Sequence, residues 1–344
     1  MALWQANTVA ARIAQTGGPP CRIITIKTSG DRLQEAPLSE IGGKSLFVKE
    51  IEDALLKNEI DIAVHSSKDM PALLPDGLAI GAVLPREDPR DAVVLPAKAI
   101  GSPHGAEGGG LRVGDRVTSI DDLSDLSDLI RALGQTPSIG TASVRRIAQL
   151  IRLFPGARFG PIRGNLDTRL RKLDAGGPDN PGDYDALVLA AAGLRRLGFA
   201  SRISFALPVE ACVPAPGQGI VAIEIRADAS DVGNVVARIN DRAARAALIA
   251  ERAVVSALGG GCQTPIGALA SPVNGEAGDE AAIDLVATVI ALDGSRIVRA
   301  RDRGPQTEAA AIGARVAARL QAEGATEILA DARIKANALE NTQH

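Results

Sequence analysis

Residues suited to acid–base chemistry or to holding a cation occupy one tight turn near residue 65. Asp69 follows Lys68 in the segment His65–Pro71, which we expect to leave the carboxyl end of a short buried strand. Open α/β sheets place their ligands at that end of their strands. A carboxylate there can move a proton or stabilise a positive charge. A solvated turn before Met70-Pro71 explains the same residues equally well.

Arginines gather at three places where a predicted strand gives way to a predicted helix. The segments are Gly140–Arg146, Ile162–Arg169 and Ala192–Gly198, and their candidate residues are Ser143, Arg145, Arg146, Arg163, Arg169 and Arg196. An arginine in a first helical turn opposes the helix dipole, so this position favours an anionic partner. Guanidinium groups on three such junctions predict a site for several carboxylates or phosphates. Solvated arginines on surface helices are the alternative, and the sequence has no nucleotide-binding glycine motif.

Three consecutive glycines precede Cys262 in the segment Leu258–Pro265. Glycine permits backbone conformations and close approaches that are closed to other residues, so we expect the cysteine at the tip of a turn. The other cysteines, Cys21 and Cys212, lie far from it in the sequence, which argues against a disulfide framework and against a zinc site. Either a group is attached to Cys262, or its thiol is incidental to a glycine-rich turn.

A further glycine-flanked segment runs from Thr28 to Phe47. It has the features of a lid over a ligand site, with Lys44 and Phe47 reaching in. A plain surface loop is the alternative, and the residue types alone slightly favour it.

The composition is that of a soluble globular protein. The 344 residues are 46% hydrophobic and 23% charged, and only 2% are aromatic, so the core must be aliphatic. The net charge of −3 and the scarcity of stacking side chains argue against a nucleic-acid binder. The apolar runs are too short to span a bilayer and the first residues lack signal-peptide features, so the cytoplasm is the simplest location.

Alternating strand-like and helix-like patterns predict an α/β protein. We expect strands at Cys21–Thr25, Ile60–Val64, Ala92–Leu95, Ala186–Ala191, Ile283–Leu292 and Ile297–Ala300. We expect helices at Phe47–Lys57, Ala142–Leu153, Leu166–Leu173, Gly193–Leu197, Asp241–Leu258 and Glu308–Gln321. The middle of the chain has the βαβ order of a largely parallel sheet, and the part after Cys262 is expected to form a small α+β domain. The polar end, Lys335–His344, is expected to fray.

Six motifs resemble those of the porphobilinogen deaminase family, also called hydroxymethylbilane synthases, and they occur in the family's order. They are His65–Pro71, Arg86–Ala92, Gly140–Arg146, Arg163-Gly164-Asn165, Pro214–Gly219 and Gly260–Gln263. The resemblance covers nearly the whole chain. It implies two α/β lobes with mixed sheets, similar to the lobes of periplasmic binding proteins, and a small C-terminal α+β domain. The implied ranges are 1–98 with about 220–238 for lobe 1, about 112–219 for lobe 2, and about 242–344 for the C-terminal domain.

The resemblance also implies a transferase of tetrapyrrole biosynthesis. Such an enzyme joins four porphobilinogen molecules head to tail, with loss of ammonia, into 1-hydroxymethylbilane. A dipyrromethane cofactor on a thioether to Cys262 primes the growing chain. The catalytic residue Asp69 stabilises the cationic azafulvene that ammonia loss leaves and manages the proton transfers.

The resemblance distributes the remaining roles among the same candidate residues. The carboxylates of cofactor and substrate are assigned to Arg145, Arg146, Arg163, Arg169 and Arg196, with help from Lys68, Ser143 and Gln218. Lys44 and Phe47 would belong to a mobile loop near the site. The implied partners are porphobilinogen and the growing polypyrrole chain, and the implied protein is a cytoplasmic monomer that binds no metal, nucleic acid or membrane.

The chain departs from the family pattern at its start. The family usually has a strand and an Arg-x-Ser-Pro-Leu segment before Ala-Leu-Trp-Gln, and here the given sequence starts at Met1 with Ala2–Gln5 next. We expect unpaired backbone and exposed apolar surface where that strand would lie. Smaller departures are Ala142 where a second serine is common and Ser45 where glycine is common.

Two alternatives to an active enzyme remain. One is a non-catalytic two-lobed binder of small polyanions, which would need neither Cys262 nor Asp69. The other is an inactive, shortened deaminase.

Overall fold

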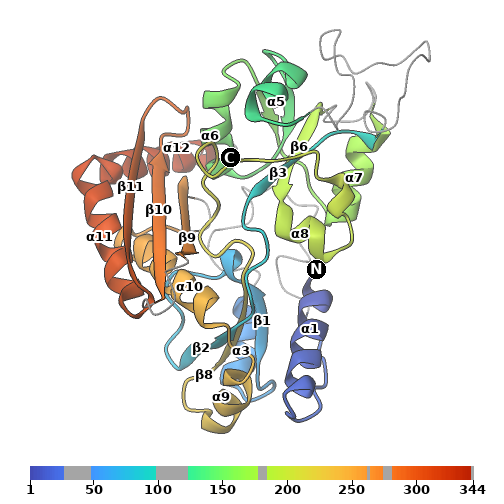
Figure 1. Cartoon of the computed structure of the whole chain (residues 1–344), viewed down its shortest axis with the longest axis vertical. Helices are drawn as coiled ribbons and strands as arrows, with labels where there is room; N and C mark the ends of the chain where they lie inside the picture. The colour runs from blue at the N-terminus through green and yellow to red at the C-terminus, as the bar shows by residue number, and fades with distance from the viewer. Residues whose placement is uncertain (27–47, 98–122, 177–183, 262–263, 274–280, 342–344) are drawn as a thin grey trace. The chain divides into compact units, whose positions relative to one another are not determined.

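The computed structural model describes residues 1–26, 48–97, 123–176, 184–261, 264–273 and 281–341 (Figure 1). Their contacts form two compact units. Unit 1 contains Met1–Glu87, Ala215–Val289 and Val298–His344, and unit 2 contains Asp88–Pro214 and Ile290–Ile297. No helix in the described ranges is both long enough and apolar enough to cross a membrane.

The first sheet of unit 1 has antiparallel pairs throughout its described strands. Its order is β1-β8-β2, with β1 at Ala63–Ser66, β8 at Val221–Arg226 and β2 at Leu78–Val83. The helices that accompany it are α1 (Ala2–Gln15), α3 (Lys49–Leu56) and α9 (Ser230–Ala237). Val9 and Ile13 lie one turn apart on α1 and pack with Ile223 of β8, so apolar burial holds this helix on the sheet.

The second sheet of unit 1 follows the long helix α10 (Arg242–Ala257). Its order is β11-β10-β9, with β9 at Ile266–Val273, β10 at Ala282–Ile290 and β11 at Ile297–Pro305. The turn η4 (Gln306–Glu308) leads into α11 (Ala309–Ala322), and α12 (Ala325–Asn341) follows. A Cβ at Gly313 would collide with the carbonyl of Ala250, so the close packing of α11 on α10 requires glycine there.

Unit 2 is built on a mixed five-stranded sheet of order β5-β4-β6-β3-β7. The strands are β3 (Asp91–Val94), β4 (Ser138–Gly140), β5 (Arg158–Gly160), β6 (Ala186–Ala190) and β7 (Phe205–Ala206). The helices and the 3-10 turn are α5 (Leu126–Leu133), α6 (Val144–Leu153), α7 (Leu166–Ala175), α8 (Ala191–Arg196) and η3 (Ala200–Arg202). Strand β4 runs parallel to β5 and β6, whereas β3 runs antiparallel to β6 and β7.

Local sequence explains where the helices of unit 2 begin. Asp125 and Asp128 form a capping box at the start of α5, in which each side chain accepts from the other residue's backbone N–H. Leu129 and Leu133 then face the core one turn apart and pack with Leu150 of α6, next to Val188 of β6. The aliphatic core expected from the composition is therefore present in this unit.

The α/β fold class with mixed sheets is confirmed. Each of the six predicted helices has a counterpart whose described ends lie within a few residues of the prediction, and β5-β4-β6 is parallel as expected. Phe47, the first residue of one predicted helix, lies outside the described residues. The division into three domains and the likeness of the lobes to periplasmic binding proteins stay predictions.

The strand predicted at Cys21–Thr25 is wrong. This segment pairs with no strand among the described residues, and the side chains of Ile23 and Ile24 are 39% and 45% exposed. An alternating apolar pattern becomes a strand only when a neighbour accepts and donates its backbone hydrogen bonds.

Two boundaries also differ from prediction. The strand expected at Ile60–Val64 lies at Ala63–Ser66, because the register of β1 on β8 starts at Ala63. The tail Lys335–His344 was expected to fray, but α12 continues through Asn341. Ile328 and Leu329 are buried on α12, so tertiary packing anchors the helix whose polar end looked unstructured.

Candidate functional site

The turn that carries Asp69 is fixed by backbone bonds at the end of β1. Ser67–Asp69 forms a single 3-10 turn, η1, in which Met70 N donates to the Ser67 carbonyl at 3.2 Å. Ser67 N donates to the carbonyl of Ile220, the residue just before β8, at 3.0 Å. Asp69 is exposed and Lys68 is half-buried. The chain therefore holds the Asp69 backbone rigidly and leaves its side chain at the surface of unit 1.

The loop Ala215–Gly219 lies directly against this turn. Gly217 has a φ of 73°, and a Cβ there would lie 2.6 Å from Ser67 Oγ, so only glycine fits. Gln218, which the sequence proposes as a substrate contact, is fully buried in unit 1, and its carbonyl accepts from Arg86 Nε at 2.9 Å. Two of the family-like motifs thus meet at the Asp69 turn.

Glu251 of α10 holds this region together, and sequence reasoning missed it. Its fully buried carboxylate pairs with Arg86 Nη1 at 2.5 Å and accepts from the backbone N–H of Gly217 at 2.6 Å and of Ala270 at 2.8 Å. The signal was available, because Ala247, Ala250 and Val254 place Glu251 on the apolar side of a helix. A buried acid on such a side must have partners elsewhere in the chain.

A second buried acid lies at the foot of the Asp69 turn. His65 Nε2 and Glu224 Oε2 are 3.0 Å apart, and the Glu224 side chain is fully buried. Burial and the nearby charge of Glu224 raise the pKa of Glu52 on α3. The pair of His65 and Glu224 joins β1 to β8 within the sheet, next to the turn on which Asp69 is exposed.

In unit 2, Arg145 and Arg146 converge on one buried carboxylate, Asp91 of β3. Arg145 Nη1 donates to Asp91 Oδ2 at 2.7 Å and to the Val213 carbonyl at 2.7 Å. Arg146 Nε donates to Asp91 Oδ1 at 2.9 Å, and its Nη1 donates to the Val188 carbonyl at 2.9 Å. Asp91 lies within the motif Arg86–Ala92, but nothing in the local sequence pattern connects it with the arginines.

The cluster around Asp91 keeps a net positive charge. Burial disfavours the charged form of Arg145, but the charges of Asp91 and Cys212 and the hydrogen bonds to both together raise the pKa of the guanidinium. Burial, together with Asp91, raises the pKa of Cys212 to about 12, so this thiol is neutral. Two guanidinium charges therefore face one carboxylate. The described hydrogen bonds of Arg145 all run through Nη1, which leaves its Nε and Nη2 as donors.

The three arginine-bearing junctions lie along one edge of the unit 2 sheet. Arg145 and Arg146 follow β4, Arg163 and Arg169 follow β5, and Arg196 follows β6. These strands are parallel neighbours, so their carboxyl ends share an edge. Arg169 Nε donates to the Gly164 carbonyl at 2.8 Å within its junction, and Ser143 is the half-buried N-cap residue of α6.

Cys262, Lys44 and Phe47 lie outside the described residues. The flanks of Cys262 are described and explain the glycines. Gly259 has a φ of 60°, and a Cβ at Gly260 would lie 2.5 Å from Ile266 Cδ1. A Cβ at Gly261 would meet nothing within 4 Å, so the chain before Cys262 borders open space.

The flank after Cys262 is bonded back to the flank before it. Thr264 N donates to the Gly261 carbonyl at 3.0 Å, and Thr264 Oγ1 donates to the same carbonyl at 2.6 Å. The backbone on both sides of Cys262 is therefore joined by hydrogen bonds between Gly261 and Thr264.

Fold and residues together define a mixed α/β protein with an exposed carboxylate on one unit and a cationic sheet edge on the other. The family model described as "Porphobilinogen deaminase, dipyromethane cofactor binding domain" matches residues 1–234. That described as "Porphobilinogen deaminase, C-terminal domain" matches residues 246–322.

Relatives and solved structures are similar to different degrees. The porphobilinogen deaminase of Geobacter metallireducens is 40% identical over 332 residues, covering 96% of this chain and 91% of that protein. That of Chromobacterium violaceum is 40% identical over 334 residues, covering 96% and 94%. A crystal structure of the Bordetella pertussis BvgS VFT2 domain is 16% identical with a TM-score of 0.34, covering 67% of this chain and 76% of that one, which is too weak to carry an argument. This chain belongs to the porphobilinogen deaminase family, as its motifs predicted.

Proposed function

We propose that this chain joins four porphobilinogen molecules head to tail into 1-hydroxymethylbilane and releases one ammonia for each. The observation that carries the proposal is the match to both family domains, with 40% identity across 96% of the chain. The enzyme is a transferase of tetrapyrrole biosynthesis. Its substrate is porphobilinogen and its cofactor is a dipyrromethane.

The residues fit a dipyrromethane bound through Cys262. Each pyrrole ring carries an acetate and a propionate, so a two-ring cofactor needs several cationic partners. Guanidinium groups at the ends of three parallel strands supply them. When bound, the cofactor supplies the carbon that attacks the first substrate. A Cβ at Gly261 would meet nothing within 4 Å, which is compatible with a bulky group on the neighbouring cysteine.

Different hydrogen bonds support different roles for Arg145 and Arg146. Arg146 donates to Asp91 and to the Val188 carbonyl, so it holds the carboxylate that orients Arg145. Arg145 is anchored through one nitrogen and offers Nε and Nη2 to a carboxylate of the ligand. Arg163, Arg169 and Arg196 extend the same sheet edge, and Ser143 adds the N-terminus of α6.

Asp69 is the catalytic residue of the proposed reaction. Loss of ammonia from porphobilinogen breaks a C–N bond and leaves a positive charge spread over the pyrrole ring. A carboxylate beside the ring stabilises that charge and accepts hydrogen bonds from pyrrole N–H groups. The same group can donate a proton to the departing amine. It can then accept a proton from the next pyrrole ring after the new C–C bond forms. Lys68 beside it contributes to binding of the substrate carboxylates.

The remaining sequence interpretations stay proposals. A non-catalytic binder of polyanions would use the arginine edge but has no use for Asp69 or Cys262. The monomeric state, the cytoplasmic location, the part of Gln218 in substrate binding and the lid formed with Lys44 and Phe47 belong to the same proposal.

A direct assay separates enzyme from binder. We expect purified protein to consume porphobilinogen and release an equal amount of ammonia, with one tetrapyrrole formed for every four substrate molecules. The Cys262→Ser variant is expected to lack this turnover. Porphobilinogen that binds without ammonia release above the protein-free rate would favour the binder and contradict the proposal.

The thiol count gives a second, independent prediction. Protein isolated from cells that make porphobilinogen should react with a maleimide at Cys21 alone, because Cys21 is exposed and the Cys212 thiol is buried with a pKa of about 12. After denaturation two of the three cysteines should react, since a thioether blocks Cys262. Peptide mapping identifies the labelled residues. Three reactive thiols in the denatured protein would exclude the thioether.

A further inference from the structure

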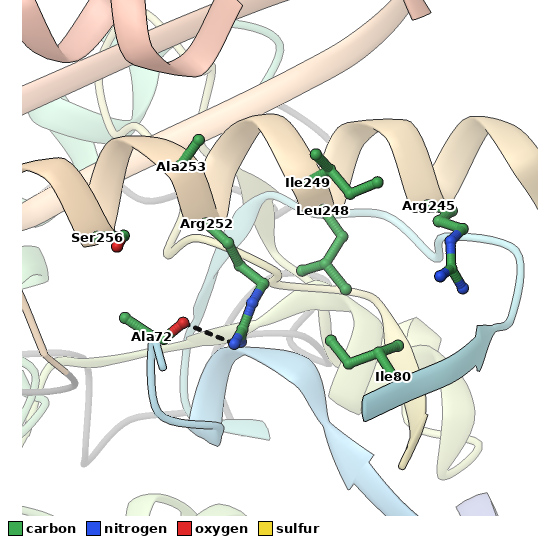
Figure 2. A pocket seen from close by; sticks show the side chains of 8 residues that line it. All are labelled: Ala72, Ile80, Arg245, Leu248, Ile249, Arg252, Ala253 and Ser256. Carbon is green, nitrogen blue, oxygen red and sulfur yellow. Dashed lines mark hydrogen bonds between the residues drawn. The ribbon is translucent and has the colours of Figure 1, made fainter. Parts of the chain in front are cut away.

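A pocket of about 280 Å³ lies in unit 1 between α10 and the sheet strand β2, and its lining includes Ala72 in the connection that follows the Asp69 turn. Figure 2 shows its walls. On α10, Arg245, Leu248, Arg252 and Ser256 recur at intervals of three and four residues and so line one face of the helix. Ile80 of β2 faces them. Neither sequence reasoning nor the proposed function gives this pocket a role.

Arg252 is a half-buried cation of the pocket, and the described charge that acts on it is that of Glu224. Its Nη2 donates to the Ala72 carbonyl at 2.7 Å, as the dashed line in Figure 2 marks, and it forms no ion pair within the described ranges. Burial lowers the pKa of this guanidinium, and the charge of Glu224 only partly opposes the effect. Partial burial of a guanidinium with N–H groups to spare costs free energy, and a bound anion would offset that cost.

Arg245 repeats the arrangement at the other end of the pocket. Its Nη1 donates to the Gly81 carbonyl at 3.2 Å, and it too forms no ion pair within the described part of the chain. Seven residues separate the two arginines, which is two helical turns or about 10 Å along the axis. Between them lie Leu248, which is 2% exposed, and Ile80. The pocket therefore has an aliphatic floor with a guanidinium at each end.

We propose that this pocket binds a small dicarboxylate whose two carboxylates are joined by an apolar spacer. One carboxylate pairs with Arg252, the other pairs with Arg245, and the spacer lies on Leu248 and Ile80. The volume is at the lower limit of ordinary ligand pockets, which fits a metabolite-sized molecule rather than a macromolecule. The site is separate from the proposed catalytic reaction and would stand if that proposal failed.

Calorimetric titration of the full chain with three chain-matched probes tests the proposal. Suberate has two carboxylates, octanoate has one, and 1,8-octanediol has none. We expect suberate to bind about tenfold more tightly than octanoate, because each charged pair adds to the affinity, and the diol to give no measurable binding. Equal affinities for suberate and octanoate, or no binding of suberate up to about 10 mM, would overturn the proposal.

Three arginine substitutions on one helix locate the binding. Arg252→Met and Arg245→Met keep an apolar stem and should each reduce suberate affinity to that of octanoate. Arg242→Met is the matched control, since Arg242 is exposed on α10 and outside the pocket, and it should leave the affinity unchanged. Suberate binding that survives both pocket substitutions would place it elsewhere, for example on the arginine edge of unit 2, and would refute this site. If Arg252→Met does not fold, the suberate affinity of Arg245→Met tests the site by itself.

Discussion

Replacing Asp69 by asparagine is expected to lower turnover about 100- to 10,000-fold while the protein stays folded. The amide keeps the size of the side chain but cannot stabilise a cationic ring or carry the proton. Asp69 is exposed at the end of β1, and backbone bonds of Ser67 and Met70 hold the turn, so we expect the fold to tolerate the substitution. Ammonia release from porphobilinogen measures the rate, and thermal unfolding measures the stability.

Asp76→Asn is the matched control for this change. Asp76 is another exposed aspartate in the connection between β1 and β2, and we expect its variant to keep both the rate and the melting temperature. Asp69→Asn protein that has already received the cofactor should show the cofactor in its intact mass, even though its later turnover is slow. Near-normal ammonia release by Asp69→Asn would remove Asp69 from the catalytic role.

Replacing Asp91 by asparagine is expected to destabilise unit 2 by about 3–5 kcal/mol. Asp91 is fully buried, and it is the carboxylate on which Arg145 and Arg146 both converge. Asparagine leaves two buried guanidinium charges without an opposite charge, and it offers one acceptor oxygen where Asp91 offers two to Arg145, Arg146 and Cys212. For a unit of this size the expected fall in melting temperature is about 10 °C. Denaturant unfolding followed by circular dichroism measures the free-energy change.

Asp167→Asn provides the comparison on the same unit. Asp167 pairs with Arg171 at 3.9 Å on the exposed side of α7, and such surface pairs contribute about 0–1 kcal/mol. If Asp91→Asn cost no more than Asp167→Asn, the buried arginine cluster would not depend on Asp91. If the folded fraction of Asp91→Asn binds anions only weakly, this result would further support the role of Asp91 in orienting Arg145.

The sequence predicted the arginine junctions because local patterns encode them. Each junction joins an apolar strand to a helix start, and the placement of Arg145 against the helix dipole already indicated an anionic partner. The structure supplies one such anion from within the chain, Asp91, which lies 54 residues earlier. That pairing depends on the antiparallel placement of β3 beside β6, so no local pattern could reveal it. The partners of Glu251 could not be predicted from local sequence either, because they come from three separate segments of the chain.

The wrong strand prediction has a related cause. Cys21–Thr25 has the residue types of a strand, but strand formation depends on a neighbour that the local sequence does not name. The opposite error occurred at the end of the chain, where the polar residues of α12 concealed a helix that Ile328 and Leu329 anchor. Hydrophobic periodicity therefore predicted helices and strands well where one face is apolar. It predicted them poorly where strand pairing or packing against distant residues determines whether the element forms.

The mass of the intact protein tests the central proposal most directly. Wild-type protein supplied with porphobilinogen should exceed its sequence mass by two porphobilinogen units less two ammonia molecules, because each attachment releases one ammonia. Cys262→Ser treated in the same way should have its sequence mass alone. A wild-type protein that stays at its unmodified mass, or a Cys262→Ser protein that carries the same adduct, would contradict a dipyrromethane tethered at Cys262.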